Sequence, residues 1–133
     1  MKENQLTEAI IGCAIKVHKA LGPGLLESAY KECLAHALYN VGFHVEIEKT
    51  LPLSFEGIVL QHGYRIDILV EHKIVVEIKS VEAINEVHIA QVLTYLKLGQ
   101  FRVGLLINFN VALLKIGIRR LVNNFSEDTS HSS

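Results

Sequence analysis

Three side chains in the middle of the chain, Asp67, Glu77 and Lys79, have types and spacing that could hold a metal ion beside a basic group. They lie in two runs typical of β-strands, 64–70 and 74–79. Because side chains alternate between the two faces of a strand, Glu77 and Lys79 are expected to share one face.

The residues between these strands set the register of the predicted hairpin. If 71–73 form its loop, Val70 pairs with Ile74, and Asp67 then falls directly opposite Glu77. Like charges directly opposite one another destabilise a strand pair. This arrangement therefore points to a cation between the two carboxylates.

A hard cation such as Mg²⁺ prefers oxygen ligands and is usually held by one or two carboxylates. The carbonyl oxygen of Ile78 could be a further ligand. Such an ion can bind a phosphate oxygen and lower the pKa of a bound water, while Lys79 could orient that water. The alternative, which spacing alone favours equally, is a solvated sheet face with a Glu77–Lys79 or Asp67–Lys79 ion pair.

Two helices are predicted before the hairpin. Asn4 or Thr7 can cap the first, which ends at the Gly22-Pro23-Gly24 run because glycine and proline stop helices. The second is predicted over 25–40. Its expected inner stripe consists of Leu26, Tyr30, Cys33 or Leu34, Ala37 and Val41.

Further strand patterns lie on both sides of these elements. Residues 43–48 alternate like a half-buried strand, whereas Pro52 argues against a central strand continuing through that point. Residues 53–60 could form an edge strand or an extended loop.

After the hairpin, a third helix is predicted over 86–98, followed by a strand at 103–107 that is apolar on both faces. A crossover of this kind makes 74–79 and 103–107 parallel neighbours. Residues 113–122 are compatible with a short strand or a helix.

The composition is that of a packed globular domain. Half of the 133 residues are hydrophobic and 20% are charged. We therefore expect one domain, 1–125, and a disordered polar tail, 126–133. No apolar run reaches the ~20 residues of a membrane span and no signal-peptide pattern is seen, so a cytoplasmic protein with no membrane contact is expected.

Charge, cysteines and histidines restrict the chemistry further. The net charge of −1 lacks the basic excess of most free-standing nucleic-acid-binding proteins, so nucleic-acid contact would need a local basic patch, a metal or a partner. Cys13 and Cys33 are isolated and are expected to be reduced core thiols. No His-Glu-x-x-His arrangement is present, which argues against a zinc hydrolase of that type.

Two motifs resemble known families. Asp67 followed by Glu77-Ile78-Lys79 resembles the signature of the PD-(D/E)xK nuclease superfamily, with Ile66 where that signature has proline. The run 24–30, with Gly24, Glu27 and Tyr30, is similar to the motif that names the GxxExxY family, which is grouped with those nucleases. The resemblance covers about residues 6–125.

The resemblance implies a restriction-endonuclease-like α/β fold: a mixed sheet flanked by helices, with an αβββαβ core and an extra N-terminal helix. It also implies Mg²⁺ or Mn²⁺ at Asp67, Glu77 and Ile78, with Glu27 as a further ligand. For Glu27 the local alternative is a favourable interaction with the helix dipole and with Lys31.

Gln91 and Tyr95 resemble the Gln-x-x-x-Tyr motif of RecB-type nucleases in the same superfamily. They share one helix face, so Gln91 could bind a phosphate oxygen or the attacking water, with Tyr95 supporting it. The alternative is an amphipathic boundary pair. Tyr30 is a candidate to touch substrate, with core packing as its alternative.

The expected function is hydrolysis of phosphodiester bonds in nucleic acid, with DNA expected over RNA. Asp67, Glu77, Lys79 and Gln91 are the predicted catalytic residues, and with Glu27 they are expected to meet in one cleft. The alternative is a catalytically silent module that binds nucleic acid or acts as a homodimeric interaction domain. A homodimer is compatible with either function.

Overall fold

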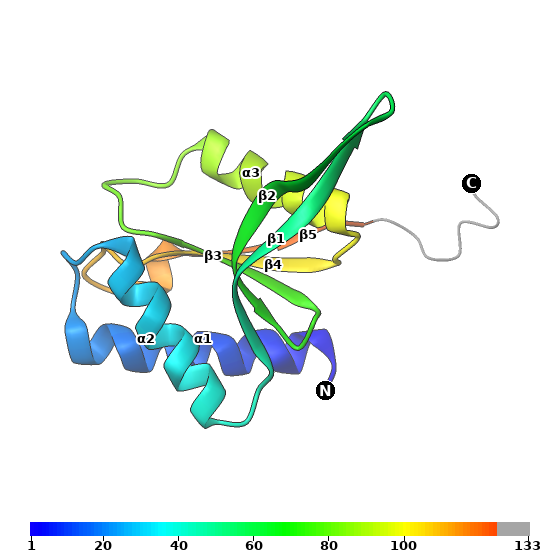
Figure 1. Cartoon of the computed structure of the whole chain (residues 1–133). Coiled ribbons are helices and arrows are strands. Elements are labelled where there is room, and N and C mark those ends of the chain that lie inside the picture. Colours follow the sequence, from blue (N-terminus) through cyan, green and yellow to red (C-terminus); the bar gives the residue numbers. More distant parts are fainter. Residues whose placement is uncertain (125–133) are drawn as a thin grey trace.

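The computed structural model describes residues 1–124, and the predicted tail at 126–133 lies outside these residues. In Figure 1, α1 and α2 lie on one face of the central sheet and α3 lies on the other. The helices are α1 (Glu3–Leu21), α2 (Glu27–Asn40), α3 (Glu86–Gly99) and a short 3₁₀ helix, η1 (Leu114–Gly117). The strands are β1 (Val45–Phe55), β2 (Ile58–Val70), β3 (Ile74–Lys79), β4 (Val103–Asn108) and β5 (Ile118–Val122).

The sheet of the described region has the order β1-β2-β3-β4-β5. β3 and β4 are parallel, as predicted, and the other neighbouring strands are antiparallel. The predicted core order from α2 to β4 is therefore confirmed, and the fold is a mixed α/β sheet flanked by helices. The ambiguous run 113–122 contains both η1 and β5. No helix in residues 1–124 is long and apolar enough to cross a membrane.

The two faces of the sheet contribute to two separate apolar clusters. Ile74, Val76 and Ile78 pack with α1 and α2, whereas Val75 packs with Val92 and the rest of the α3 cluster. The side chains of β3 thus alternate as the sequence predicts, and Glu77 occupies the α3 side together with Val75.

In β2, the alternation of side chains between the two faces of the sheet is interrupted at Asp67. Ile68 belongs to the cluster under α1 and α2, but Ile66 belongs to the α3 cluster, although only one residue separates them. The pairing between β2 and β3 runs from Val70–Ile74 to Ile68–Val76 and goes no further. The predicted register is confirmed up to the position of Asp67, where side-chain interactions replace the regular ladder.

The ends of the first two helices differ from the prediction. The residue at the N-cap of α1 is Lys2 instead of Asn4 or Thr7, and the Thr7 hydroxyl instead donates to the Asn4 carbonyl. α2 starts at Glu27, because Leu26 has an extended backbone and serves as the N-cap.

The predicted inner stripe of α2 was only partly right. Leu26, Cys33 and Val41 are exposed, and Cys33, although a free thiol as predicted, is therefore not part of the core. The buried residues of α2 are Tyr30, Leu34, Ala35 and Leu38. The later start of the helix explains the exposure of Leu26, since this residue precedes the first helical turn.

β1 and β2 form a long hairpin that projects from the body of the domain (Figure 1). β1 continues through Pro52, and because β1 lies at the edge of the sheet this agrees with the expectation that the proline excludes a central strand there. An edge strand tolerates proline because one side of it has no hydrogen-bonding neighbour. The register shifts between Leu51 and Leu53, and Gly63 allows this irregularity, since a Cβ there would lie 2.3 Å from the Leu53 Cβ.

Candidate active site

The side chains of Asp67 and Glu77 each accept a main-chain hydrogen bond across the β2–β3 hairpin. The Asp67 amide donates to Glu77 Oε2 at 2.8 Å, and the Ile78 amide donates to Asp67 Oδ2 at 2.9 Å. Each carboxylate therefore takes a main-chain donor from the facing strand, which explains why the strand ladder stops here. Glu77 is only 4% exposed.

Burial changes the protonation of this pair. It raises the pKa of Asp67, and it raises the pKa of Glu77 to about 8, with the negative charge of Asp67 as the next cause. Lys79 and Lys31 oppose both shifts without cancelling them. The pair therefore retains a proton at neutral pH unless a cation replaces it.

The carboxylates also keep oxygens for such a cation. Among the described residues, each accepts one hydrogen bond, through Oδ2 of Asp67 and Oε2 of Glu77. The remaining oxygens, with the main-chain carbonyl of Ile78 beside them in the chain, form the donor set that a hard divalent cation prefers. This fit comes from the residues alone, and the ligand assignment stays a prediction.

Glu27 reaches the same region from another element. As the first residue of α2, it accepts a hydrogen bond through Oε2 from the Ser80 amide at 3.2 Å. The Ser80 hydroxyl donates to the Leu25 carbonyl at 2.6 Å, so the segment after β3 is fastened to the start of α2. The charge of Glu27 contributes to the raised pKa of Asp67, so this third carboxylate interacts electrostatically with Asp67.

Lys79, Gln91 and Tyr95 form a hydrogen-bonded chain from β3 to α3. Lys79 Nζ donates to Gln91 Oε1 at 3.3 Å, and Gln91 Nε2 donates to the Tyr95 hydroxyl at 3.1 Å. Burial raises the pKa of Tyr95, and the nearby charge of Glu77 raises it further. The Tyr95 ring also stacks on Tyr64, with ring centroids 4.9 Å apart.

The contacts of Tyr30 are those of a core residue that supports the fold. It is fully buried, and its ring stacks on Phe109 with centroids 4.5 Å apart. Its hydroxyl donates to the Gly22 carbonyl at 2.5 Å and accepts from the Leu25 amide at 3.1 Å. These contacts fix the loop between α1 and α2, and we omit Tyr30 from the site proposed below.

Two residues near the site were not identified as such from the sequence. Lys31, considered only as a helical neighbour of Glu27, lowers the pKa of both Asp67 and Glu77 and forms an ion pair with Glu48 at 2.6 Å. Its position one helical turn after Glu27 was the available signal.

Asn108 is the second of these residues. It is 2% exposed, accepts from the Val81 amide and donates to the Val81 carbonyl, both at 3.0 Å. It thereby fixes the segment that follows Lys79. The feature that could have identified Asn108 from the sequence is its position, as a polar residue, at the end of an otherwise apolar strand.

Hydrogen bonds and charge effects place Asp67, Glu77, Lys79, Gln91 and Glu27 on or next to β3 and the segment that follows it. Three carboxylates, one ammonium group and one amide, supplied by β2, β3, α2 and α3, are suited to binding a divalent cation and a phosphate. These are the chemical groups that a metal-assisted phosphodiesterase requires.

A family comparison agrees with this class. The model of the PD-(D/E)XK nuclease superfamily matches residues 4–121, which is most of the chain. The chain belongs to this superfamily. Comparisons with curated proteins and with solved structures give no match.

Proposed function

We propose that the protein is a divalent-metal-dependent nuclease that hydrolyses phosphodiester bonds of nucleic acid. Membership of the nuclease superfamily supports the reaction class. The observation that carries the proposal is the buried Asp67–Glu77 pair, because burial and the charge of Asp67 raise the pKa of Glu77 to about 8, and a bound cation would favour its ionised form. The closer relationship to the GxxExxY family is part of the same proposal.

The residues would have distinct tasks. Asp67, Glu77 and the Ile78 carbonyl would hold Mg²⁺ or Mn²⁺, with Glu27 as an additional carboxylate. When bound, the ion supplies a positive charge for a phosphate oxygen and a water of lowered pKa.

Lys79 and Gln91 would act on the attacking water and the phosphate, not on the metal ion. The ammonium group of Lys79 orients the attacking water or a phosphate oxygen, and Gln91 holds the lysine through Oε1. Tyr95 fixes the Gln91 amide through its hydroxyl. Positioning of this kind lowers the barrier because the reacting groups are already aligned.

The substrate is nucleic acid, with DNA expected over RNA. The net charge of −1 means that the whole chain has no excess of basic residues for phosphate binding. Local positive charge at the site, from the metal ion and from Lys79 and Lys31, would provide the attraction instead. A homodimer remains compatible with this function.

The test is metal-dependent cleavage of DNA and RNA substrates by the wild type and by Asp67→Asn. We expect cleavage with Mg²⁺ or Mn²⁺, none in the presence of a chelator, and a loss of at least about 100-fold in Asp67→Asn. Glu86→Gln, which alters an exposed carboxylate at the start of α3, is the matched control and should retain activity.

Two results would count against the proposal. Equal cleavage by Asp67→Asn and the wild type would place the reaction elsewhere. Salt-dependent nucleic-acid binding without cleavage under any divalent metal would favour the catalytically silent binding module.

A further inference from the structure

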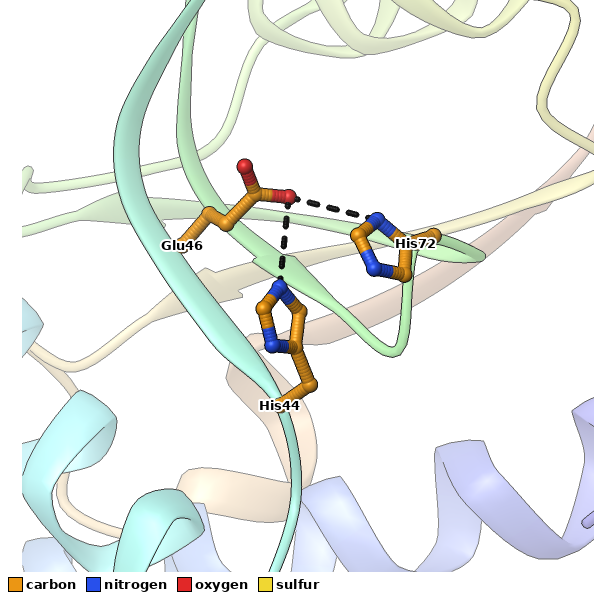
Figure 2. A group of neighbouring side chains, drawn as sticks. All are labelled: His44, Glu46 and His72. Carbon is orange, nitrogen blue, oxygen red and sulfur yellow. Dashed lines mark ion pairs between the residues drawn. The ribbon is translucent and has the colours of Figure 1, made fainter.

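A second group of potential metal ligands lies near the turn between β2 and β3. Figure 2 shows His44, Glu46 and His72 directed toward one another. Glu46 Oε1 lies 3.7 Å from His44 Nε2 and 3.4 Å from His72 Nδ1. The group shares no residue with the proposed active site, which is built around the far end of β3.

Hydrogen bonds do not explain why these three side chains lie together. Within the described residues, Glu46 Oε1 is buried and has no hydrogen-bond partner, although two ring nitrogens lie near it. Ligands about 2.1 Å from a tetrahedral zinc ion are about 3.4 Å from one another, which is close to the two distances observed here.

The turn is held in a conformation that brings His72 to this position. Glu71 and His72 have φ values of 54° and 56°, in the left-handed region that residues other than glycine seldom adopt. The His44 amide donates to Glu71 Oε2 at 2.6 Å, and the Glu71 amide donates to the His44 carbonyl at 2.9 Å. The imidazole rings of His44 and His72 stack with centroids 4.4 Å apart.

The other oxygen of Glu46 is already occupied. Lys49 Nζ lies 3.0 Å from Oε2 and forms an ion pair with this oxygen. Lys49 therefore orients the carboxylate and leaves Oε1 for the space between the two imidazoles. Partners of this kind commonly fix the ligands of metal sites.

We propose that His44, Glu46 and His72 form a second metal site, which binds Zn²⁺ or a chemically similar transition-metal ion. Two imidazole nitrogens and one carboxylate oxygen are a zinc ligand set, and water would complete the tetrahedron. Mg²⁺ prefers ligands that are all oxygen, so the two sites would select different ions. A bound ion would connect the start of β1 to the β2–β3 turn.

The experiment uses metal-free protein titrated with Zn²⁺ by calorimetry and with Co²⁺ by visible absorption, which reports tetrahedral coordination. One ion should bind per chain. His72→Asn and His44→Gln should weaken binding at least about tenfold, since each removes one of three protein ligands. Asparagine tolerates the left-handed backbone at position 72, so His72→Asn should fold normally.

Two controls separate this site from other possibilities. His62→Asn removes an exposed histidine elsewhere on β2, and Asp67→Asn alters the proposed active site; both should retain Zn²⁺ affinity. Zn²⁺ should also raise the melting temperature of the wild type and of both controls, but not that of His72→Asn.

Three results would overturn the proposal. These are the absence of one-to-one Zn²⁺ binding, unchanged affinity in both histidine variants, or loss of Zn²⁺ binding in Asp67→Asn. The last result would move the ion to the carboxylate pair. Because none of these readouts depends on cleavage, the second site is tested separately from nuclease activity.

Discussion

Lys79 Nζ donates a hydrogen bond to Gln91 Oε1 at 3.3 Å, which connects the end of β3 to α3. Gln91 uses its Nε2 to donate to the Tyr95 hydroxyl, so both ends of the amide are engaged. The amide cannot rotate without losing both interactions. The lysine is therefore held in one place beside the carboxylate pair.

Lys79→Ala should reduce metal-dependent cleavage by about 100-fold to 1,000-fold, because it removes a positioned donor from the proposed site. The measurement is the single-turnover cleavage rate at saturating metal. Lys97→Ala, which changes an exposed lysine near the end of α3, should keep the wild-type rate. Wild-type cleavage by Lys79→Ala would remove the lysine from the mechanism.

Glu77 should make the stability of the metal-free protein depend on pH. Its ordinary pKa is 4.5, and burial raises the pKa to about 8 in the folded chain, so the folded state binds the proton more tightly. The resulting stabilisation is complete below about pH 4.5 and is lost as the pH rises through about 8. Urea unfolding in a chelator should show this decline for the wild type.

Glu77→Gln should have a much weaker decline over the same pH range, because glutamine does not titrate. Its stability relative to the wild type should therefore increase as the pH rises toward 8 and above. Some dependence should remain, since burial also raises the pKa of Asp67. Identical pH profiles for the two proteins would show that folding does not raise the pKa of Glu77.

Glu27→Gln should separate the charge of this residue from its hydrogen bond. Glutamine can still accept the bond from the Ser80 amide, but it cannot attract a cation. We expect a Mg²⁺ requirement for cleavage raised about tenfold, with an unchanged melting temperature. Glu32→Gln, at an exposed position on the same helix, is the control and should match the wild type. Unchanged Mg²⁺ dependence in Glu27→Gln would exclude Glu27 as a ligand.

Tyr30→Phe should lower the free energy of unfolding by about 1 kcal/mol, because the Gly22 carbonyl and the Leu25 amide lose their partner in a partly buried place. Urea denaturation measures this change. Tyr39→Phe should change stability by less than about 0.5 kcal/mol, since Tyr39 is 70% exposed. Equal stability of the two variants would contradict the structural role of Tyr30.

Local patterns in the sequence were sufficient for the central hairpin. The loop at 71–73 determines that Val70 pairs with Ile74, and strand alternation then places Glu77 on one face. The parallel pairing of β3 and β4 also follows from the sequence, because a crossover through a helix requires it. These features depend on neighbouring residues and on chain connectivity.

Tertiary structure decided the features that depend on distant segments. Pro52 itself indicated an edge position, but only the pairing of β1 with β2 shows that one strand runs through this proline. His44 and His72 come together because β1 pairs with β2, and the break in alternation at Asp67 arises from its exchange of hydrogen bonds with β3. Spacing along the chain specifies which residues share a face, but only packing determines which faces meet.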